Sequence, residues 1–355
     1  MLNQDISQAL REQVIEATET NTALHIQGGN TKAFYGRQTE GETIDLSTHS
    51  GIVNYEPTEL VITARAGTPL KEIEDTLLAQ GQILPFEPPH YGNNATLGGT
   101  IACNFSGPRR VARGPARDYV LGCKLLNGKG EIISFGGEVM KNVAGYDVSR
   151  LMAGALGTLG VLLEISLKVL PKPESEITLT LERNTDKALA KLTRLAQVDF
   201  PISATCYDGY KLYIRLGGTE GAVEKSRKPI GGEVIPSDQN IWQKIKEHQH
   251  GFFNTSEPLW RISVAADTPP LEIDGKVLYE WNSSLRWCTS KANAKTIQQV
   301  ARNAGGHAIR FRGHDQNAED IFHPLPSALL AVHKKLKLAF DPNGIFNPGR
   351  MYLGL

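Results

Sequence analysis

Glycine-rich loops are the segments of this sequence whose residue types are best suited to bind a ligand. Glycine accounts for 35 of the 355 residues, against a background of about 7%, and the glycines cluster in a few places. The segment Gln27–Lys32, with the sequence QGGNTK, directly follows a short apolar run. Consecutive glycines tolerate positive φ angles and let backbone N–H groups converge on an anion. The segment is therefore predicted to bind an anion, with a plain tight turn as the alternative.

Two further segments could place bare backbone against a ligand. Small residues at 94–100 (NATLGGT) and 104–107 (NFSG) flank the short run Ile101–Cys103. They lie inside the long, weakly periodic stretch 81–117, and long ordered loops are often functional. Glycines also recur every three residues at 154, 157 and 160. A flat ligand would explain the first pattern, with a core turn as the alternative, and close packing of a helix on a strand could by itself explain the second.

Arginine is concentrated in the segment Arg109–Asp118. Four arginines fall within nine residues there, which predicts a cation rim for phosphates or an acidic substrate, with a solvated loop as the alternative. Nucleic-acid binding is disfavoured, because Lys+Arg and Asp+Glu both total 38 and the net charge is 38 − 38 = 0. Domains that bind nucleic acids are usually basic.

Several common signatures are missing from the sequence. It contains no G-x-G-x-x-G fingerprint, and Gly128-Lys129 lacks the flanking residues of a phosphate-binding P-loop. The four cysteines form no C-x-x-C pair, so this chain alone is not expected to hold an iron–sulfur or zinc site. No signal-peptide pattern begins the chain, and the longest apolar run, 151–163, is too short for a transmembrane helix. We expect a soluble cytoplasmic protein.

Two patterns of secondary structure are predicted to position these loops. In the first part of the chain, the loop 81–117 lies between predicted helices and strands. The helices are expected at 5–20, 68–79 and 148–155. The strands are expected at 23–26, 61–66, 120–126, 132–135 and 160–170. Pro171-Lys172-Pro173 predicts a domain boundary. Beyond it we expect strands at 177–181, 204–208, 211–216, 259–265, 277–281 and 307–311 and helices at 185–197, 291–303 and 326–340. This second pattern predicts an α+β domain with an antiparallel sheet.

The order of these motifs resembles the vanillyl-alcohol-oxidase/PCMH-type FAD-binding family. GGNTK, PP…TLGG…SG, RG…RD, KNVAGYD and G-x-x-G-x-x-G follow one another between residues 28 and 160, and DPNGIFNPGR at 341–350 resembles the segment that this family returns to the flavin. Each motif is weak alone, but six in the right order are specific. The resemblance implies an α+β fold with a PCMH-type FAD-binding domain of two α+β subdomains at 1–172. It further implies a reduced α+β cap with an antiparallel sheet at 173–328 and a returning segment at 329–355.

The resemblance also implies cofactor-binding roles along these motifs. The FAD pyrophosphate would be cradled by backbone donors of Gln27, Gly28, Gly29, Asn30, Thr31 and Lys32. The flavin and the rest of the diphosphate would be lined by Pro88, Thr96, Leu97, Gly98, Gly99, Ser106 and Gly107, with Arg113, Gly114 and Asp118 near this wall. The adenosine end would contact Gly154, Gly157, Gly160 and Val161, and the isoalloxazine would be approached by Asn347.

Two departures from the family's patterns bear on the chemistry. Several relatives bind the flavin covalently through a histidine in the pyrophosphate loop, whereas this loop has Asn30, so we predict non-covalent FAD. Catalytic relatives also carry His-x-Gly-Asp-Gly-Asn-x-His and a later Glu-His pair near a metal. Here residues 312–317 read RGHDQN and no Glu-His pair follows, so no metal site is predicted.

Oxidation of a 2-hydroxy acid needs a hydride acceptor, a base for the hydroxyl proton and a cation for the carboxylate. Arg261, Arg286 and Arg312 are candidate cations, because arginine binds carboxylates bidentately; the alternative is that they support the sheet or an interface. His314 and His323 are candidate bases or solvated loop histidines. No catalytic residue is assigned from the sequence.

Over essentially the full length, the resemblance is to subunits of complexes that oxidise glycolate to glyoxylate. It implies an FAD-dependent oxidoreductase subunit that passes electrons through flavin to partners, namely a catalytic FAD subunit and an iron–sulfur subunit. A non-catalytic subunit for holding FAD or transferring electrons is one alternative. A stand-alone D-lactate or 2-hydroxy-acid dehydrogenase is another. The protein would be cytoplasmic, or held peripherally at the inner membrane by its partners.

Overall fold

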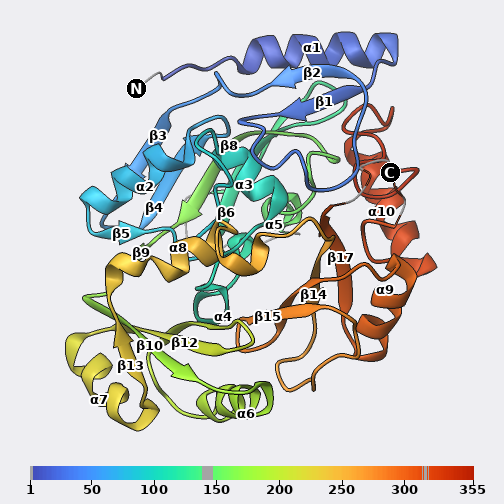
Figure 1. The fold of residues 1–355 in the computed structure, drawn as a ribbon. Helices are drawn as coiled ribbons and strands as arrows, with labels where there is room; N and C mark the ends of the chain where they lie inside the picture. Colours follow the sequence, from blue (N-terminus) through green and yellow to red (C-terminus); the bar gives the residue numbers. More distant parts are fainter. Residues whose placement is uncertain (1–2, 138–146, 314, 316–317, 319) are drawn as a thin grey trace. The chain divides into compact units, whose positions relative to one another are not determined.

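The computed structural model describes residues 3–137, 147–313, 315, 318 and 320–355. The chain divides into two compact units (Figure 1). The first unit comprises Met1–Ser106, Pro115–Pro171 and Pro324–Leu355, and the second comprises Gly107–Gly114 and Lys172–His323. The second unit therefore includes a short excursion from the N-terminal half of the chain.

The first unit is built on an antiparallel sheet with the strand order β3-β4-β8-β6-β7 in the described residues. Its strands are β3 (Ile52–Glu56), β4 (Val61–Arg65), β6 (Val120–Leu126), β7 (Ile132–Gly136) and β8 (Val161–Lys168). The central strand β8 (VLLEISLK) is buried at every position except Glu164 and Lys168, which agrees with its largely apolar sequence. Helices of this unit are α1 (Ser7–Thr20), α2 (Leu70–Ala79), α3 (Leu97–Cys103), η1 (Ala116–Tyr119), α5 (Val148–Met152) and α10 (Ser327–Phe340).

Two small sheets complete the first unit, and one of them carries the cavity described below. Strands β5 (Gln82–Ile83) and β9 (Leu170–Pro171) pair antiparallel, and β1 (Leu24–Gln27) pairs parallel with β2 (Glu42–Asp45). The C-terminal segment runs along β1, because Leu24 N donates to Ile345 O (2.7 Å) and Asn347 N donates to Leu24 O (2.9 Å). Residues more than 300 positions apart are thus joined by backbone hydrogen bonds.

The second unit is an eight-stranded sheet, in the described residues, with the order β13-β10-β12-β11-β15-β16-β14-β17 and antiparallel pairs. Its strands are β10 (Ser175–Glu182), β11 (Ile202–Tyr207), β12 (Lys211–Gly218), β13 (Glu233–Ile235), β14 (Leu259–Ser263), β15 (Lys276–Glu280), β16 (Leu285–Thr289) and β17 (His307–Arg312). Its helices are α4 (Arg110–Arg113), α6 (Thr185–Leu195), α7 (Glu220–Ile230), η2 (Ser237–Gln239), α8 (Ile241–Lys246), η3 (Gly251–Phe253) and α9 (Ala294–Asn303). The predicted α+β class with an antiparallel sheet is confirmed.

Local predictions that were wrong have identifiable causes. Strand β16 was not expected, since all five of its residues are buried and it shows no period-two alternation. The helix expected at 68–79 begins instead at Leu70, as α2, without a side-chain cap. The Thr68 hydroxyl instead donates to Gly51 O (3.2 Å) and accepts from Gly51 N (2.9 Å).

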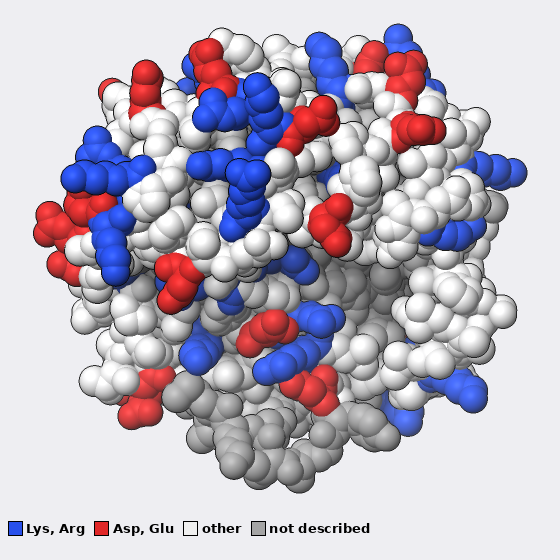
Figure 2. Space-filling view, turned by 90° about the horizontal axis from the view of Figure 1, so that it is seen from below, with Lys and Arg blue, Asp and Glu red and all other residues white. Residues whose placement is uncertain are grey.

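The distribution of surface charge agrees with the formal net charge of zero. On the face shown in Figure 2, acidic and basic side chains are interspersed. No helix in the described part of the chain combines the length and apolar character needed to cross a bilayer.

Trp281 anchors the 107–114 excursion to the second unit. Its indole Nε1 donates to Gly107 O (3.0 Å) in a buried position. The Arg110 and Arg261 guanidinium groups lie 4.4 and 5.3 Å from the Trp281 ring centroid. Cation–π contacts of this kind stabilise by about 0.5–2 kcal/mol each. Arg109 also forms an ion pair with Glu176 (2.5 Å), so Arg109 and Arg110 both make contacts within the unit.

The substitution W281F tests this anchor. It removes the donor to the buried Gly107 carbonyl, which we expect to lower the unfolding free energy of the second unit by about 1–2 kcal/mol. Trypsin should then cut faster after Arg110 and Arg113, as followed by mass spectrometry during limited proteolysis. Y210F, at a tyrosine 59% exposed, is the control. Unchanged cleavage in W281F would contradict the anchoring role.

Candidate functional site

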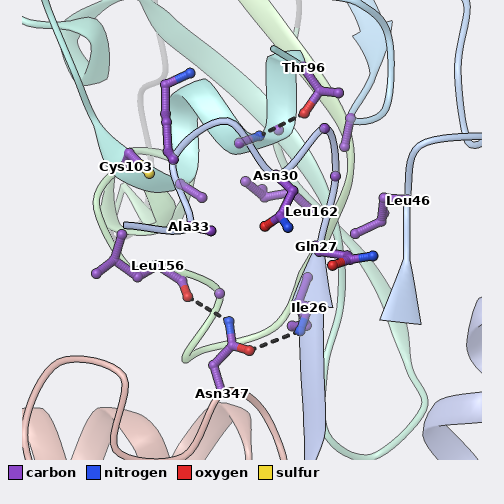
Figure 3. A pocket seen from close by; sticks show the side chains of 18 of the residues that line it. Ile26, Gln27, Asn30, Ala33, Leu46, Thr96, Cys103, Leu156, Leu162 and Asn347 are labelled. Carbon is purple, nitrogen blue, oxygen red and sulfur yellow. Dashed lines mark hydrogen bonds between the residues drawn. The ribbon is translucent and has the colours of Figure 1, made fainter. Parts of the chain in front are cut away.

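A cavity in the first unit gathers four segments that are distant in the sequence (Figure 3). It encloses about 960 Å³ of empty space, a figure that includes the part open to solvent. Its walls come from four segments. These are residues 25–33, the helix α3, residues 155–160 before β8 (the glycine loop), and the C-terminal segment with Asn347 and Arg350. Apolar side chains such as Ile26, Leu46 and Leu162 form much of the lining, as expected for a site that holds a ring system.

The loop after β1 offers unpaired backbone donors. In the part of the chain that the structure describes, the N–H groups of Gly28, Gly29, Asn30 and Thr31 donate to no protein acceptor. Asn30 has a left-handed φ of 57°, and such turns direct successive N–H groups into an anion-binding concavity. Lys32 is 7% exposed, and its ammonium group lies 3.2 Å from His90 O. The loop therefore supplies donors and a positive charge to the cavity wall.

Helix α3 contributes shape to the cavity, because its first N–H groups already have partners. Leu97 N donates to Thr68 O and Gly98 N to Ala66 O, while Thr96 Oγ1 accepts from Gly99 N. A Cβ on Gly98 would lie 2.7 Å from Ala66 Cβ, whereas one on Gly99 would meet just Thr96 Oγ1 at 3.2 Å. Gly98 is needed for packing, and Gly99 leaves open space beside the lining.

Asn347 joins the cavity's segments to one another. Its side chain accepts a hydrogen bond from Ile26 N (2.9 Å) and donates one to Leu156 O (2.8 Å), as Figure 3 shows. The residue is 4% exposed. A Cβ on Gly157 would lie 2.7 Å from the Asn347 amide nitrogen, so glycine is required there. Asn347 lines the cavity while both of its amide atoms hold β1 to the glycine loop.

A buried ion pair holds the segment that carries Asn347. Lys337 Nζ lies 2.7 Å from Asp341 Oδ2 and donates to Thr158 O (2.8 Å) and Phe346 O (2.7 Å). Asp341 in turn accepts from the backbone N–H groups of Ile345 and Phe346. Burial lowers the pKa of Lys337, against the opposing effect of Asp341. The pair fixes both the turn before Asn347 and the glycine loop.

Arg350 fixes the other side of the anion-binding loop and adds charge to the cavity. Its guanidinium donates to Arg37 O (2.7 Å), Tyr35 O (2.7 Å) and Ala33 O (3.2 Å). Burial lowers the pKa of Arg350, with a smaller opposing effect of Cys103. Burial also raises the pKa of the Cys103 thiol, which keeps this lining residue uncharged. Burial, and secondarily Arg350, lowers the pKa of His25. The cavity's cations thus favour an anionic ligand.

The structure brings together just over half of the cofactor-binding residues expected from the sequence. Those that line the cavity are Gln27, Gly28, Gly29, Asn30, Thr31, Lys32, Thr96, Gly98, Gly99, Gly157, Gly160 and Asn347. Sequence reasoning did not single out Arg350, Cys103, His25 or Leu156. Arg350 could have been found, since it ends the DPNGIFNPGR motif.

The remaining expected residues lie outside this lining: Pro88, Leu97, Ser106, Gly107, Arg113, Gly114, Asp118, Gly154 and Val161. Leu97 and Val161 are 1% and 0% exposed and pack in the hydrophobic core. Ser106 accepts a hydrogen bond from Ala116 N (2.9 Å). Gly107, Arg113 and Gly114 belong to the second unit. Residues 141–146 of the KNVAGYD motif lie outside the described residues.

The candidate catalytic residues are largely engaged in contacts within the second unit. Arg286 is 1% exposed and donates to the carbonyls of Ser283, Pro269 and Thr268. The Arg312 guanidinium lies 5.7 Å from the Phe311 ring centroid. His323 Nδ1 accepts from Ala308 N (3.3 Å), and burial lowers its pKa. His314 lies outside the described residues. No group of three or more His, Cys, Asp or Glu side chains that could hold a metal occurs in the described residues.

The substitution K337M tests the ion pair as the support of the C-terminal segment. It leaves the buried Asp341 carboxylate without its cation, which we expect to cost about 3–5 kcal/mol of unfolding free energy. The double variant K337M/D341N should recover part of that loss, because it removes both charges. K335M, on the exposed side of the same helix, is the control. Urea unfolding should be followed by far-UV circular dichroism, since the four tryptophans lie in the second unit. A K337M loss no larger than that of K335M would contradict the role.

The family comparison agrees with this geometry. Residues 5–136 match the model of the family described as "FAD binding domain". The chain is 50% identical to glycolate oxidase subunit GlcE of Escherichia coli (strain K12) over 351 residues, which cover 99% of each chain. It is 36% identical to glycolate oxidase subunit GlcD of Bacillus subtilis (strain 168), covering 88% of this chain and 80% of that one.

A solved structure supports the fold. An alkyldihydroxyacetonephosphate synthase structure superposes with a TM-score of 0.69 at 15% identity, covering 96% of this chain and 75% of the other. That likeness concerns the fold alone, whereas the sequence relatives are FAD-dependent hydroxy-acid oxidoreductases or subunits of them. The chain therefore belongs to the family of FAD-binding oxidoreductases of 2-hydroxy acids that includes glycolate oxidase subunit GlcE.

Proposed function

We propose that this chain is the FAD-binding subunit of a complex that oxidises glycolate to glyoxylate. The observation that carries the proposal is the row of unpaired N–H groups at Gly28–Thr31 beside Lys32, in a largely apolar cavity. This combination suits the two parts of FAD, a charged pyrophosphate and flat rings. The near full-length likeness to GlcE supplies the substrate. In this proposal the first unit holds FAD and the second forms the cap.

In this proposal, different residues of the cavity contact different parts of the cofactor. Bound FAD supplies a two-electron acceptor. The N–H groups of the loop and the Lys32 ammonium would neutralise the pyrophosphate, and Gly99 would leave room for the ligand. Asn30 stands where several relatives attach the flavin to a histidine, so the binding proposed here is non-covalent.

One observation favours a second candidate, in which this subunit transfers electrons without oxidising substrate itself. The Arg286 guanidinium donates hydrogen bonds to three backbone carbonyls, and His323 Nδ1 accepts one from a backbone N–H. A residue that is held in this way has less capacity left for a carboxylate or a hydroxyl proton. The proposed base and carboxylate cation would then be provided by a partner.

The proposal includes two partners, a catalytic FAD subunit and an iron–sulfur subunit. The four cysteines at 103, 123, 206 and 288 are free thiols dispersed over both units, so an iron–sulfur relay would have to lie in another chain. We place the assembly in the cytoplasm, where its partners could attach it to the inner membrane.

The substitution G99L tests the cavity as the FAD site. Gly99 lies in α3 with an ordinary φ, and its missing Cβ faces nearly open space at the cavity. A leucine should therefore preserve the fold and fill cofactor space, lowering FAD affinity at least about ten-fold, as a lost contact of about 1.4 kcal/mol would. G221L is the matched control, because Gly221 is also helical with nothing within 4 Å of its Cβ position.

FAD content after purification and reconstitution, measured by absorbance, gives the readout. An FAD affinity of G99L equal to that of the wild type would contradict the assignment of this cavity as the FAD site. Gly29 is less suitable for such a test, since its Cβ would lie 1.4 Å from Asn94 O and any side chain would disturb the fold.

Anaerobic mixing with glycolate tests the function and separates the two candidates. Loss of the oxidised flavin absorbance in the isolated chain would favour direct oxidation of the substrate by this subunit. Loss of this absorbance only when the partner subunits are also present would favour the electron-transfer candidate. A protein that cannot be reconstituted with FAD would overturn both. Release of FAD into the supernatant on denaturation is expected, and retention would contradict non-covalent binding.

A further inference from the structure

Lys32 is the cation of the anion-binding loop (Gln27–Lys32), and its side chain is held from outside that loop. Its ammonium group lies 3.2 Å from His90 O, a carbonyl 58 positions farther along the chain. The lysine is buried and lines the cavity. A lysine side chain loses much rotamer freedom when it is fixed. A contact that fixes the ammonium before the ligand arrives therefore strengthens binding, because less of that freedom is lost on association.

Residues 90–94, which we call the backing segment, touch the anion-binding loop at two further points. A Cβ on Gly29 would lie 1.4 Å from Asn94 O, so the two backbones are in close contact there. A Cβ on Gly92 would lie 3.2 Å from Thr31 Cγ2. The backing segment therefore sets the path of the anion-binding loop and also holds its lysine.

The backing segment has a strained backbone that depends on its surroundings. Tyr91 has a left-handed φ of 54°, which is unfavourable for a bulky residue and persists where neighbouring contacts hold it. The Tyr91 ring packs edge-on against Phe34 and Phe105, with centroid distances of 5.6 and 6.1 Å. These apolar contacts restrain Tyr91, and the residue before it is restrained by a polar contact.

Glu74 supplies that polar contact. Because a carboxylate only accepts hydrogen bonds, the His90 ring donates from Nε2 to Glu74 Oε2 (2.9 Å). Glu74 lies in α2, which is fixed in the hydrophobic core by Leu70, Ile73 and Leu77. The hydrogen bond thus ties the backing segment to a helix that cannot easily move. Both side chains are partly exposed, so removing either one opens no cavity in the core.

We propose that Glu74 and His90 are positioning residues for Lys32, which would neutralise the FAD pyrophosphate. The contacts run from α2 through the Glu74 carboxylate and the His90 ring to the His90 carbonyl and the Lys32 ammonium. Neither Glu74 nor His90 is among the described residues that line the cavity, so both act through Lys32. The inference rests on the proposed function, because FAD is the ligand whose pyrophosphate Lys32 would meet.

The affinity for FAD tests this arrangement in the full-length chain. H90A and E74A each remove the hydrogen bond, and each should weaken FAD binding about ten-fold, as loss of a well-placed charged donor does. E74Q keeps an acceptor oxygen and should retain most of the affinity. D75A is the matched control, because Asp75 is exposed on the same helix and pairs with Lys71 at the surface, where such pairs contribute little. Titrations of the FAD-free protein, followed by flavin fluorescence, give the dissociation constants.

The effect of both variants should pass through Lys32. In a K32M background, H90A and E74A should weaken FAD binding by less than about two-fold, because the ammonium group that they position is gone. Added salt should weaken FAD binding by the wild type more than by K32M or H90A, since a placed charge contributes less in these variants. Losses of affinity that are equal in the wild-type and K32M backgrounds would mean a general disturbance of the fold and would overturn the proposal.

A measurement without FAD follows the lysine itself. Acetic anhydride modifies accessible amines, and mass spectrometry of the FAD-free protein gives the rate at Lys32 relative to the exposed Lys276. Since Lys32 is buried in the wild type, H90A and E74A should raise its relative rate several-fold by releasing it. D75A should leave that rate unchanged. The thermal midpoint is measured for every variant, so that release of the lysine is separated from loss of folding.

Failure of the proposal and failure of the proposed function give different results. If H90A and E74A keep the FAD affinity and the Lys32 acetylation rate of the wild type, the positioning role is refuted, even in a chain whose flavin is reduced by glycolate. If both variants raise the acetylation rate of Lys32 in a chain that binds no FAD, the proposed function is refuted and the positioning of Lys32 stands.

Discussion

The ion pair between Lys337 and Asp341 is the contact on which the cavity depends. A buried ion pair is unfavourable unless its remaining hydrogen-bonding capacity is used, and here Lys337 also donates to two carbonyls while Asp341 accepts two backbone N–H groups. The pair therefore fixes the turn that precedes Asn347. Asn347 then links β1 to the glycine loop, so four distant segments enclose one space.

The glycines of the cavity serve two physical purposes that composition cannot separate. Gly98 and Gly157 are required by packing, because a Cβ on either would lie 2.7 Å from a neighbouring atom. Gly99 has room for a side chain and is open toward the cavity. The loop Gly28–Thr31 contributes through its unpaired N–H groups. A ligand site built in this way presents backbone donors on a wall with few bulky side chains, which suits a flat anionic cofactor.

The arginines illustrate how tertiary contacts change the meaning of a charged segment. From the sequence, Arg109–Arg117 predicts a cation rim for phosphates. In the structure, Arg109 pairs with Glu176, and Arg110 lies over the Trp281 ring from within the same unit. The cations that line the cavity are instead Lys32, from the loop after β1, and Arg350, from the far end of the chain. Two of the four clustered arginines thus contact their own unit, whereas the two cations of the cavity lining come from segments far apart in the sequence.

The sequence by itself determined the α+β class and the antiparallel sheet beyond residue 172, because strand alternation is a local signal. It also predicted an anion-binding loop at Gln27–Lys32, and these residues line the cavity. It missed β16, whose burial on both faces removes alternation, and it did not indicate that the side chains of Leu97 and Val161 pack in the hydrophobic core. Only the tertiary structure decided that Arg350 and Leu156 line the cavity and that the 107–114 excursion belongs to the second unit. Those facts depend on contacts between segments far apart in the chain, for which local residue patterns carry no signal.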